Sequence, residues 1–363
     1  MAEEVKYVKM SKKEMNHTLN IFKAFACLGV VIIHCTFPEP ARAGGRALGC
    51  FGVPLFFCIS GFFVTGSEET LSTKKTLKKL RHILCLLLFS EAFYSLFSYL
   101  YYKMYIPENK MEFFGNRFKE GWLEKFFLLN QPPVWSHLWF MYALATLYLC
   151  VLILFKSRKS LVYLSYFAVP VFLLAIIFMQ EFSFLKIIPN GFRVPQSETL
   201  FYRSSMFIFR AVPFFGLGIL FKYHQEKIRC LFSVKVVRLF PVLIVAFLSF
   251  SVLEAYLFSV AQFYIGSILA MTTMMLYSIC KPDSKCRPLE YLGSNLSMWV
   301  YIFHPAIMHV YNSICSKMQI GSKAVVLWSR PIVVIILTIC LSIIVEKIYH
   351  FICDLKNKKT LIY

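Results

Sequence analysis

Long apolar stretches separated by short polar and basic segments cover most of this 363-residue chain. The stretches are near 18 to 22 residues long, about the length that an α-helix needs to cross a bilayer. We therefore predict an all-α, polytopic membrane protein with about ten transmembrane helices. The predicted spans are residues 20–37, 49–66, 83–105, 135–155, 161–180, 204–221, 239–258, 262–280, 296–316 and 325–349.

Composition agrees with the spacing of the apolar stretches. Hydrophobic residues make up 58% of the chain and charged residues 16%, whereas a soluble domain has about 25% charged residues. The mean hydropathy is +0.63. The 38 Phe and 20 Tyr suit lipid-facing and interfacial positions. These values exclude an ordinary soluble domain.

Basic residues give the chain a formal charge of +20, and they lie in short runs between the apolar stretches. KKTLKKLRH, KSRK and KYHQEKIR are the clearest runs. With the N-terminus inside, the inner segments hold roughly 23 basic residues and the outer ones roughly 11. We therefore expect both termini in the cytosol. Anionic lipid headgroups, rather than nucleic acid, are the expected partners, with an anionic cytosolic substrate as a further possibility.

The expected organisation is a cytosolic leader (1–19), one membrane domain (20–350) and a basic cytosolic tail (351–363), with no attached soluble domain. No cleavable signal peptide is apparent, because the polar leader is long and no small-residue cleavage site follows the first apolar run. The 12 Cys form no CxxC pair and no Cys/His cluster at zinc spacing. No metal site is expected.

The first span carries two ionisable residues, Lys23 and His34. At about 100° per residue, their spacing returns them to nearly the same helix face, roughly three turns and about 16 Å apart. Ionisable groups inside a membrane are costly and are functional candidates. His34 is either a general base or a packing residue hydrogen-bonded across the bundle. Lys23 either reaches the inner headgroups or shares a cavity with His34.

A short Pro/Gly turn is expected between the first span and the second, Phe-rich span. The second span and the segment after it supply further candidates. GVPLFFCISGFFV contains Ser60 and small residues that permit close helix approach. The predicted inner loop that follows holds a basic cluster of Lys74, Lys75, Lys78, Lys79 and Arg81. This cluster either sets topology and contacts headgroups, or binds the phosphates of a cytosolic cofactor, with Arg81 offering bidentate contacts.

Other polar residues lie within the later spans. Opposite charges on different helices can neutralise one another, as Glu254 and Arg210 could. His137 and Trp139 mark the outer mouth of the fourth span, where a Trp is a common interfacial anchor. In SMWVYIFHPAIMHV, Pro305 is expected to kink the helix beside a histidine and to expose backbone carbonyls. The remaining ionisable groups inside the predicted spans are Glu91, His304 and His309.

Several motifs, in this order, resemble the integral-membrane acyltransferase type 3 family, which includes bacterial sugar and peptidoglycan O-acetyltransferases. The resemblance covers essentially all ten predicted spans, and the HLWFMY version most resembles the O-acetyltransferase group related to enterobacterial common antigen modification. The matching residues are Lys23 with His34, FF-x-x-SGFF from Phe56 to Phe63, Lys79-Leu80-Arg81, HLWF from His137 to Phe140, and Leu292-Gly293…Ser297…Tyr301…His304-Pro305.

The resemblance implies a ten-helix domain around a transmembrane cavity, a cytosolic acyl-CoA donor, and an acceptor hydroxyl on the outer side or within the membrane. It makes His34 the catalytic candidate and Lys23, Lys78, Lys79 and Arg81 the donor-side candidates. Ser60, Glu91, His137, Trp139, Arg210, Tyr301 and His304 become candidates for the cavity lining. The chain departs from the family in having Lys-x-Arg where members often have two arginines, so a point charge replaces one bidentate phosphate clamp.

The predicted function is transfer of an acyl group, most plausibly acetyl, from acetyl-CoA to a hydroxyl of a cell-surface glycan or lipid-linked sugar. No permanently bound cofactor is expected. The predicted location is the bacterial inner membrane, and a separate periplasmic or extracellular protein is a possible acyl-accepting partner. The alternative is a transporter or flippase for a glycan or small metabolite, in which the intramembrane His, Glu and Arg residues form a polar pathway.

Overall fold

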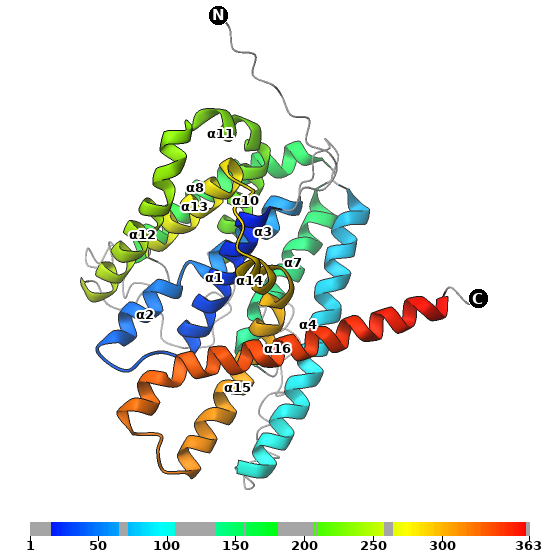
Figure 1. Cartoon of the computed structure of the whole chain (residues 1–363). Helices are drawn as coiled ribbons and strands as arrows, with labels where there is room; N and C mark the ends of the chain where they lie inside the picture. The colour runs from blue at the N-terminus through cyan, green and yellow to red at the C-terminus, as the bar shows by residue number, and fades with distance from the viewer. Residues whose placement is uncertain are drawn as a thin grey trace, which may run out of the picture.

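The computed structural model describes residues 16–64, 72–105, 135–155, 157–180, 207, 210–257 and 264–360, and the secondary structure in these ranges is helical throughout (Figure 1). The elements are α1 (His17–His34), α2 (Ala41–Gly49), α3 (Gly52–Val64), α4 (Thr73–Tyr105), η2 (Ser136–Leu138), α7 (Trp139–Leu154), α8 (Arg158–Gln180), α10 (Val212–Tyr223), α11 (Gln225–Leu231), α12 (Val234–Leu257), α13 (Ile265–Cys280), α14 (Arg287–Tyr291), η4 (Leu292–Leu296), α15 (Ser297–Lys317) and α16 (Ala324–Thr360).

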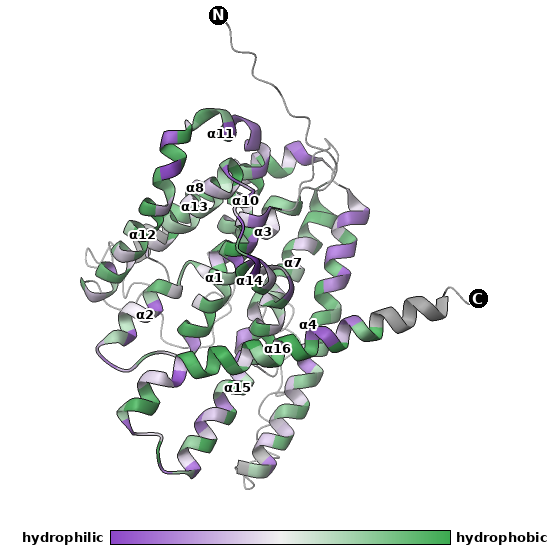
Figure 2. Ribbon diagram, in the orientation of Figure 1, coloured by the Kyte–Doolittle hydropathy of each residue, from purple (hydrophilic) through white to green (hydrophobic). Residues whose placement is uncertain are grey.

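The all-α, polytopic membrane architecture is confirmed, and a helix occupies each of the ten predicted ranges. By length and composition, six helical segments among the described residues can cross a membrane. Two further helices, α10 and α13, are apolar but shorter. Figure 2 shows apolar residues along most of these helices. The six segments are 17–34, 41–64, 73–101, 136–154, 234–257 and 324–352.

Small residues allow the central helices to approach one another closely. A Cβ on Gly61 of α3 would lie 1.9 Å from the backbone oxygen of Phe215 in α10, and a Cβ on Gly218 would lie 1.9 Å from the oxygen of Cys58. Each helix therefore presents a glycine to the backbone of the other, and any larger residue would force them apart. The interpretation of the glycine in SGFF as a packing residue is confirmed for Gly61.

Two local expectations from the sequence were wrong. The Pro/Gly turn after the first span contains α2, whose Ala47 packs against Ala255 and Tyr264. The basic stretch expected as an inner loop forms the first turns of α4 from Thr73 onward. Lys, Leu and Arg are good helix formers, and neither Gly nor Pro interrupts the stretch, so it extends the following span instead of ending it.

The last helix also differs from the expected boundary. The final span was predicted to end at residue 349, but α16 continues to Thr360. The segment includes the basic stretch that was assigned to the tail. Helical structure therefore runs from the membrane span into the tail without a break.

Helix α1 lies in the middle of the bundle and contacts α2, α3, α13, η4, α14 and α15. A Cβ on Gly293 in η4 would lie 1.8 Å from the backbone oxygen of Asn20, so this glycine allows α1 to meet the start of α15 closely. Two turns further along α1, the Cys27 thiol donates to the Ser297 carbonyl at 3.4 Å. These contacts place one face of α1 against α15.

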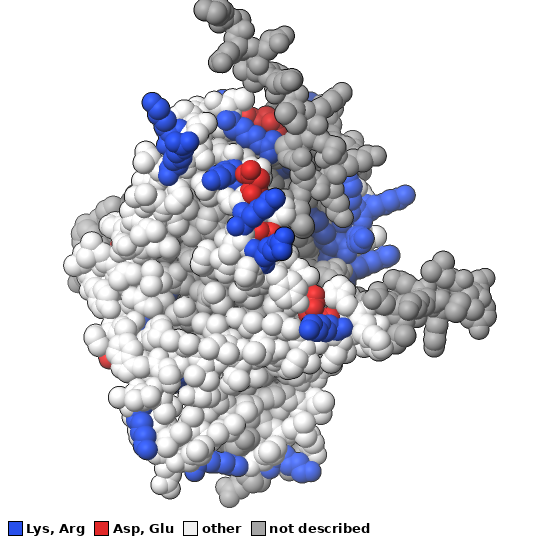
Figure 3. Space-filling model, viewed as in Figure 1, with Lys and Arg blue, Asp and Glu red and all other residues white. Residues whose placement is uncertain are grey.

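Lys and Arg gather toward one end of the molecule, where α11, α14 and the start of α4 lie (Figures 1 and 3). At the same end, the Asn16 amide donates to the Ser278 carbonyl at 2.7 Å, and the Thr18 hydroxyl donates to the Lys281 carbonyl. The other end of α1, at His34, points toward the end of the bundle that carries the α15–α16 hairpin (Figure 1). The chain is thus polarised in charge along the direction of α1.

Candidate active site

Three histidines from different parts of the sequence meet at the far end of α1. His34 is the last residue of α1, His137 lies in η2 just before α7, and His304 lies in α15. The ring centroids of His34 and His304 are 5.1 Å apart, and those of His137 and His304 are 5.8 Å apart. We refer to His34, His137 and His304 as the histidine cluster.

The orientation of His304 follows from the helix that carries it. Its Nδ1 lies 3.1 Å from the carbonyl oxygen of Val300, one turn earlier in α15. Since a carbonyl only accepts, Nδ1 must carry the proton and Nε2 is left as the acceptor of a neutral ring. Nε2 is buried and has no hydrogen-bond partner among the described residues. His304 therefore presents an unused acceptor within the cluster.

His137 is held by aromatic neighbours. The Tyr301 hydroxyl donates to the His137 carbonyl, and the rings of Tyr94 and His137 pack edge to face at 4.9 Å. The Ile302 carbonyl, which faces this imidazole, already accepts from the Tyr94 hydroxyl at 2.5 Å. Both ring nitrogens of His137 are buried without a hydrogen-bond partner among the residues described. Buried nitrogens without partners are uncommon and call for a functional explanation.

His34 is the accessible member of the cluster. Its side chain is exposed, whereas His137 and His304 are buried. Arg46 of α2 is close enough to act electrostatically on the His34 imidazole. A substrate can therefore contact His34 directly, whereas the other two histidines are buried beside it.

A further cation lies near the histidine that opens the fourth span. The Arg210 guanidinium stands over the Trp139 ring at 5.6 Å from its centroid, a cation–π geometry. The ring of Trp139 also packs on Phe57 at 5.9 Å. Trp139 follows His137 by two residues, so Arg210 is held next to the segment that carries His137.

Three other candidates form hydrogen bonds at separate places. Glu91 accepts a hydrogen bond from the Tyr142 hydroxyl at 2.7 Å, which joins α4 to α7. The Ser60 hydroxyl donates to the Phe56 carbonyl one turn earlier at 2.8 Å. Glu254 accepts from the backbone N–H groups of Ile265 at 3.0 Å and Gly266 at 2.9 Å, so it caps the N-terminus of α13.

The donor-side candidates form a second group, at the basic end of the bundle. Lys79 turns inward, where its ammonium donates to the Phe63 carbonyl and lies 5.9 Å from the centre of the Tyr148 ring. Lys78 and Arg81 are exposed. Lys23 is half-buried on α1. Among Lys78, Lys79 and Arg81, only Lys79 is directed inward.

Two contributors to the site carried no signal in the sequence. Tyr94 lies in the middle of a long apolar run and resembles any buried aromatic residue. Arg46 lies in the stretch that was expected to be a Pro/Gly turn, so its proximity to His34 depended on the unpredicted helix α2. Within the described ranges, no group of three or more His, Cys, Asp or Glu residues is arranged to hold a metal ion.

The fold and this site define a polytopic membrane protein in which an accessible histidine adjoins two buried ones. The chain matches the acyltransferase 3 family, described as an acyltransferase domain, over residues 16–347. It belongs to this family and is a membrane acyltransferase. No curated protein and no solved structure matches the chain.

Proposed function

We propose that this acyltransferase moves an acetyl group from cytosolic acetyl-CoA to a hydroxyl of a cell-surface glycan or lipid-linked sugar. The observation that carries the proposal is the histidine cluster, with an accessible imidazole on one face of α1 and the Lys23 ammonium toward the basic end. A cationic surface at one end of the bundle would bind the donor, and the histidine cluster at the other end would meet the acceptor. This placement suits transfer of an acetyl group across the bilayer.

In the proposed reaction, His34 takes the proton of the acceptor hydroxyl as its oxygen attacks the thioester carbonyl. A C–O bond forms, the C–S bond breaks, and the thiolate of CoA receives the proton. In the second form of the proposal, a ring nitrogen of His34 attacks the thioester carbonyl, the C–S bond breaks, and CoA leaves as the thiol with the proton of the ring. The hydroxyl then attacks the acetyl group, the C–N bond breaks, and the imidazole takes the proton of the hydroxyl. His304 and His137 position His34 in both forms.

The donor would lie along α1 from the basic end. Lys79 and Lys23, with Lys78 and Arg81 at the surface, are the proposed contacts of the CoA phosphates. Ser60, Glu91, Trp139, Arg210 and Tyr301 are the proposed lining of the path between the donor end and the cluster. We propose a bacterial inner-membrane location with both termini cytosolic, and a separate acyl-accepting protein is an additional proposed partner.

Mass spectrometry of surface glycans from cells with and without the gene tests the proposal. We expect one acetyl group per repeat to be lost with the gene and restored by the wild-type chain but not by a His34→Ala chain. Identical glycans in all three strains would contradict it. Uptake of a glycan by proteoliposomes without any acyl donor would instead favour a transporter, since intramembrane polar residues also line transport paths.

A further inference from the structure

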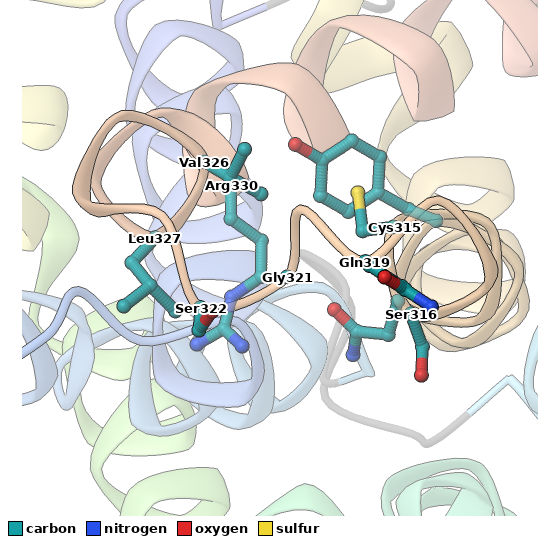
Figure 4. Close-up of a pocket in the computed structure, with 10 residues that line it drawn as sticks. Cys315, Ser316, Gln319, Gly321, Ser322, Val326, Leu327 and Arg330 are labelled. Carbon is teal, nitrogen blue, oxygen red and sulfur yellow. The ribbon is translucent and has the colours of Figure 1, made fainter.

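A polar pocket lies at the hairpin that joins α15 to α16, outside the histidine cluster (Figure 4). Its volume is about 560 Å³, within the range of small-molecule sites. The hairpin is at the same end of the bundle as His34 and opposite the basic end (Figure 1). We propose that this pocket binds an anionic group, a carboxylate or a phosphate, of the hydroxyl-bearing acceptor. This inference rests on the proposed function.

Arg330 of α16 gives the pocket its charge. It is the only charged residue in the lining, and no carboxylate among the described residues pairs with it. One of its terminal nitrogens, Nη2, donates to the Thr36 carbonyl at 2.9 Å, and the guanidinium also makes a hydrogen bond with the Cys35 thiol. Its Nε is buried without a partner in the part of the chain that the structure describes. A guanidinium with unused donors suits a bidentate contact with carboxylate or phosphate oxygens.

The rest of the lining offers hydrogen bonds to a polar molecule. Figure 4 shows the Arg330 guanidinium beside Ser322 on one side of the pocket, and Ser316 and Gln319 on the other. Asn312 also lines the pocket. Hydroxyl and amide groups that surround a single cation match a ligand with both hydroxyls and an anion. A purely apolar ligand would leave these groups unpaired, which costs binding free energy.

The pocket is connected directly to the end of α1. Thr36, whose carbonyl holds Arg330, follows His34 by two residues. Next to it, the rings of Phe37 and Trp328 pack at 6.2 Å between centroids. The N-terminal part of α16 is therefore anchored to the segment that leaves the active-site helix. A molecule held by Arg330 would lie near the C-terminal end of α1, which is formed by His34.

Binding of sugars to the purified full-length protein tests the pocket without requiring acetyl transfer. The probes are glucuronate and glucose 1-phosphate, which separate a carboxylate from a phosphate, with glucose as the neutral reference. Titration calorimetry should show tighter binding of at least one anionic probe than of glucose, and Arg330→Gln should weaken that probe by about tenfold or more. Lys323→Gln, an exposed residue of the hairpin that does not line the pocket, should leave affinity unchanged.

Ser316→Leu provides a second variant, because Arg330→Gln also removes the contact with Thr36. It fills the pocket from the exposed surface of α15 and should weaken the same probe while the melting temperature stays at the wild-type value. Three results would contradict the proposal that this pocket binds an anionic group. They are equal binding of glucose and both anions, no binding of any probe, and unchanged affinity in both variants. Acetyl-CoA turnover, measured on the same preparations, reports separately on the proposed function.

Discussion

His34 and His304 come from helices far apart in the sequence, and their rings lie 5.1 Å apart. Because His304 keeps its proton on Nδ1 through the Val300 carbonyl, its Nε2 remains an acceptor. We propose that this acceptor orients the neighbouring His34 ring. His304 is in this account a positioning residue. The sequence pattern marked both histidines, but it carried no information on their distance.

We predict that His304→Ala lowers kcat by about tenfold to a hundredfold and leaves the KM for acetyl-CoA unchanged. His304→Gln, whose amide oxygen can replace the Nε2 acceptor, should recover part of the rate. His309→Ala is the matched control on α15, since the His309 ring packs on Trp135 at 4.8 Å. Steady-state kinetics decides the question, and an equal loss in both alanine variants would contradict the positioning role.

The contribution of Glu290 to stability at the basic end can be tested by changing the pH. Its carboxylate lies 2.5 Å from Nδ1 of His17 and accepts from the Cys286 N–H at 2.7 Å, and these bonds hold the pKa of Glu290 below its ordinary value. A lowered folded-state pKa gives stability that is present above the unfolded value of about 4.3 and is lost as pH falls through the folded value. The melting temperature of wild type should therefore exceed that of Glu290→Gln at pH 7. The two should converge below about pH 4, and a constant difference would contradict the assignment.

At the scale of helices, close packing and charge determine what each element does. The contact between α3 and α10 depends on Gly61 and Gly218, each facing the backbone of the other helix. We predict that Gly61→Ala destabilises the fold by about 1–3 kcal/mol or abolishes it, because the new Cβ would overlap the Phe215 oxygen. Gly321→Ala, where a Cβ has no neighbour closer than 3.8 Å, should be neutral. Melting temperatures in detergent compare the two.

The start of α4 gives a second prediction at this scale. Lys79 faces the interior, whereas Lys78 is exposed on the same helix turn. A partly buried, directed ammonium binds phosphate more strongly than a solvated one, so Lys79→Ala should raise the KM for acetyl-CoA by about tenfold. Lys78→Ala should have a smaller effect that shrinks with added salt. Equal effects would indicate that only the general charge of this end matters.

Apolar run length predicted where the helices lie but not all of their ends. It placed a helix in all ten ranges because hydrocarbon thickness sets a minimum length. It missed α2, whose stability depends on packing of Ala47 against Ala255 and Tyr264, a contact between distant segments. It also separated the basic stretch 74–81 from α4, since polarity marks the edge of the membrane and not the end of a helix.

For the molecule as a whole, the structure separates two chemical environments along α1. Cations gather at the end with the start of α4 and α14, while the histidine cluster and the pocket around Arg330 lie toward the other end. Helical periodicity placed Lys23 and His34 on one face of α1. Periodicity within one helix could not show that His137 and His304 join His34, because tertiary packing brings them together.

We propose that His34 carries out the acyl transfer. The most direct test is turnover of labelled acetyl-CoA by the purified protein and by His34→Ala, with His309→Ala as the matched histidine control. We expect a loss of about a hundredfold or more in kcat for His34→Ala, at an unchanged melting temperature and with near wild-type turnover in the control. Turnover by His34→Ala at the wild-type rate would contradict it.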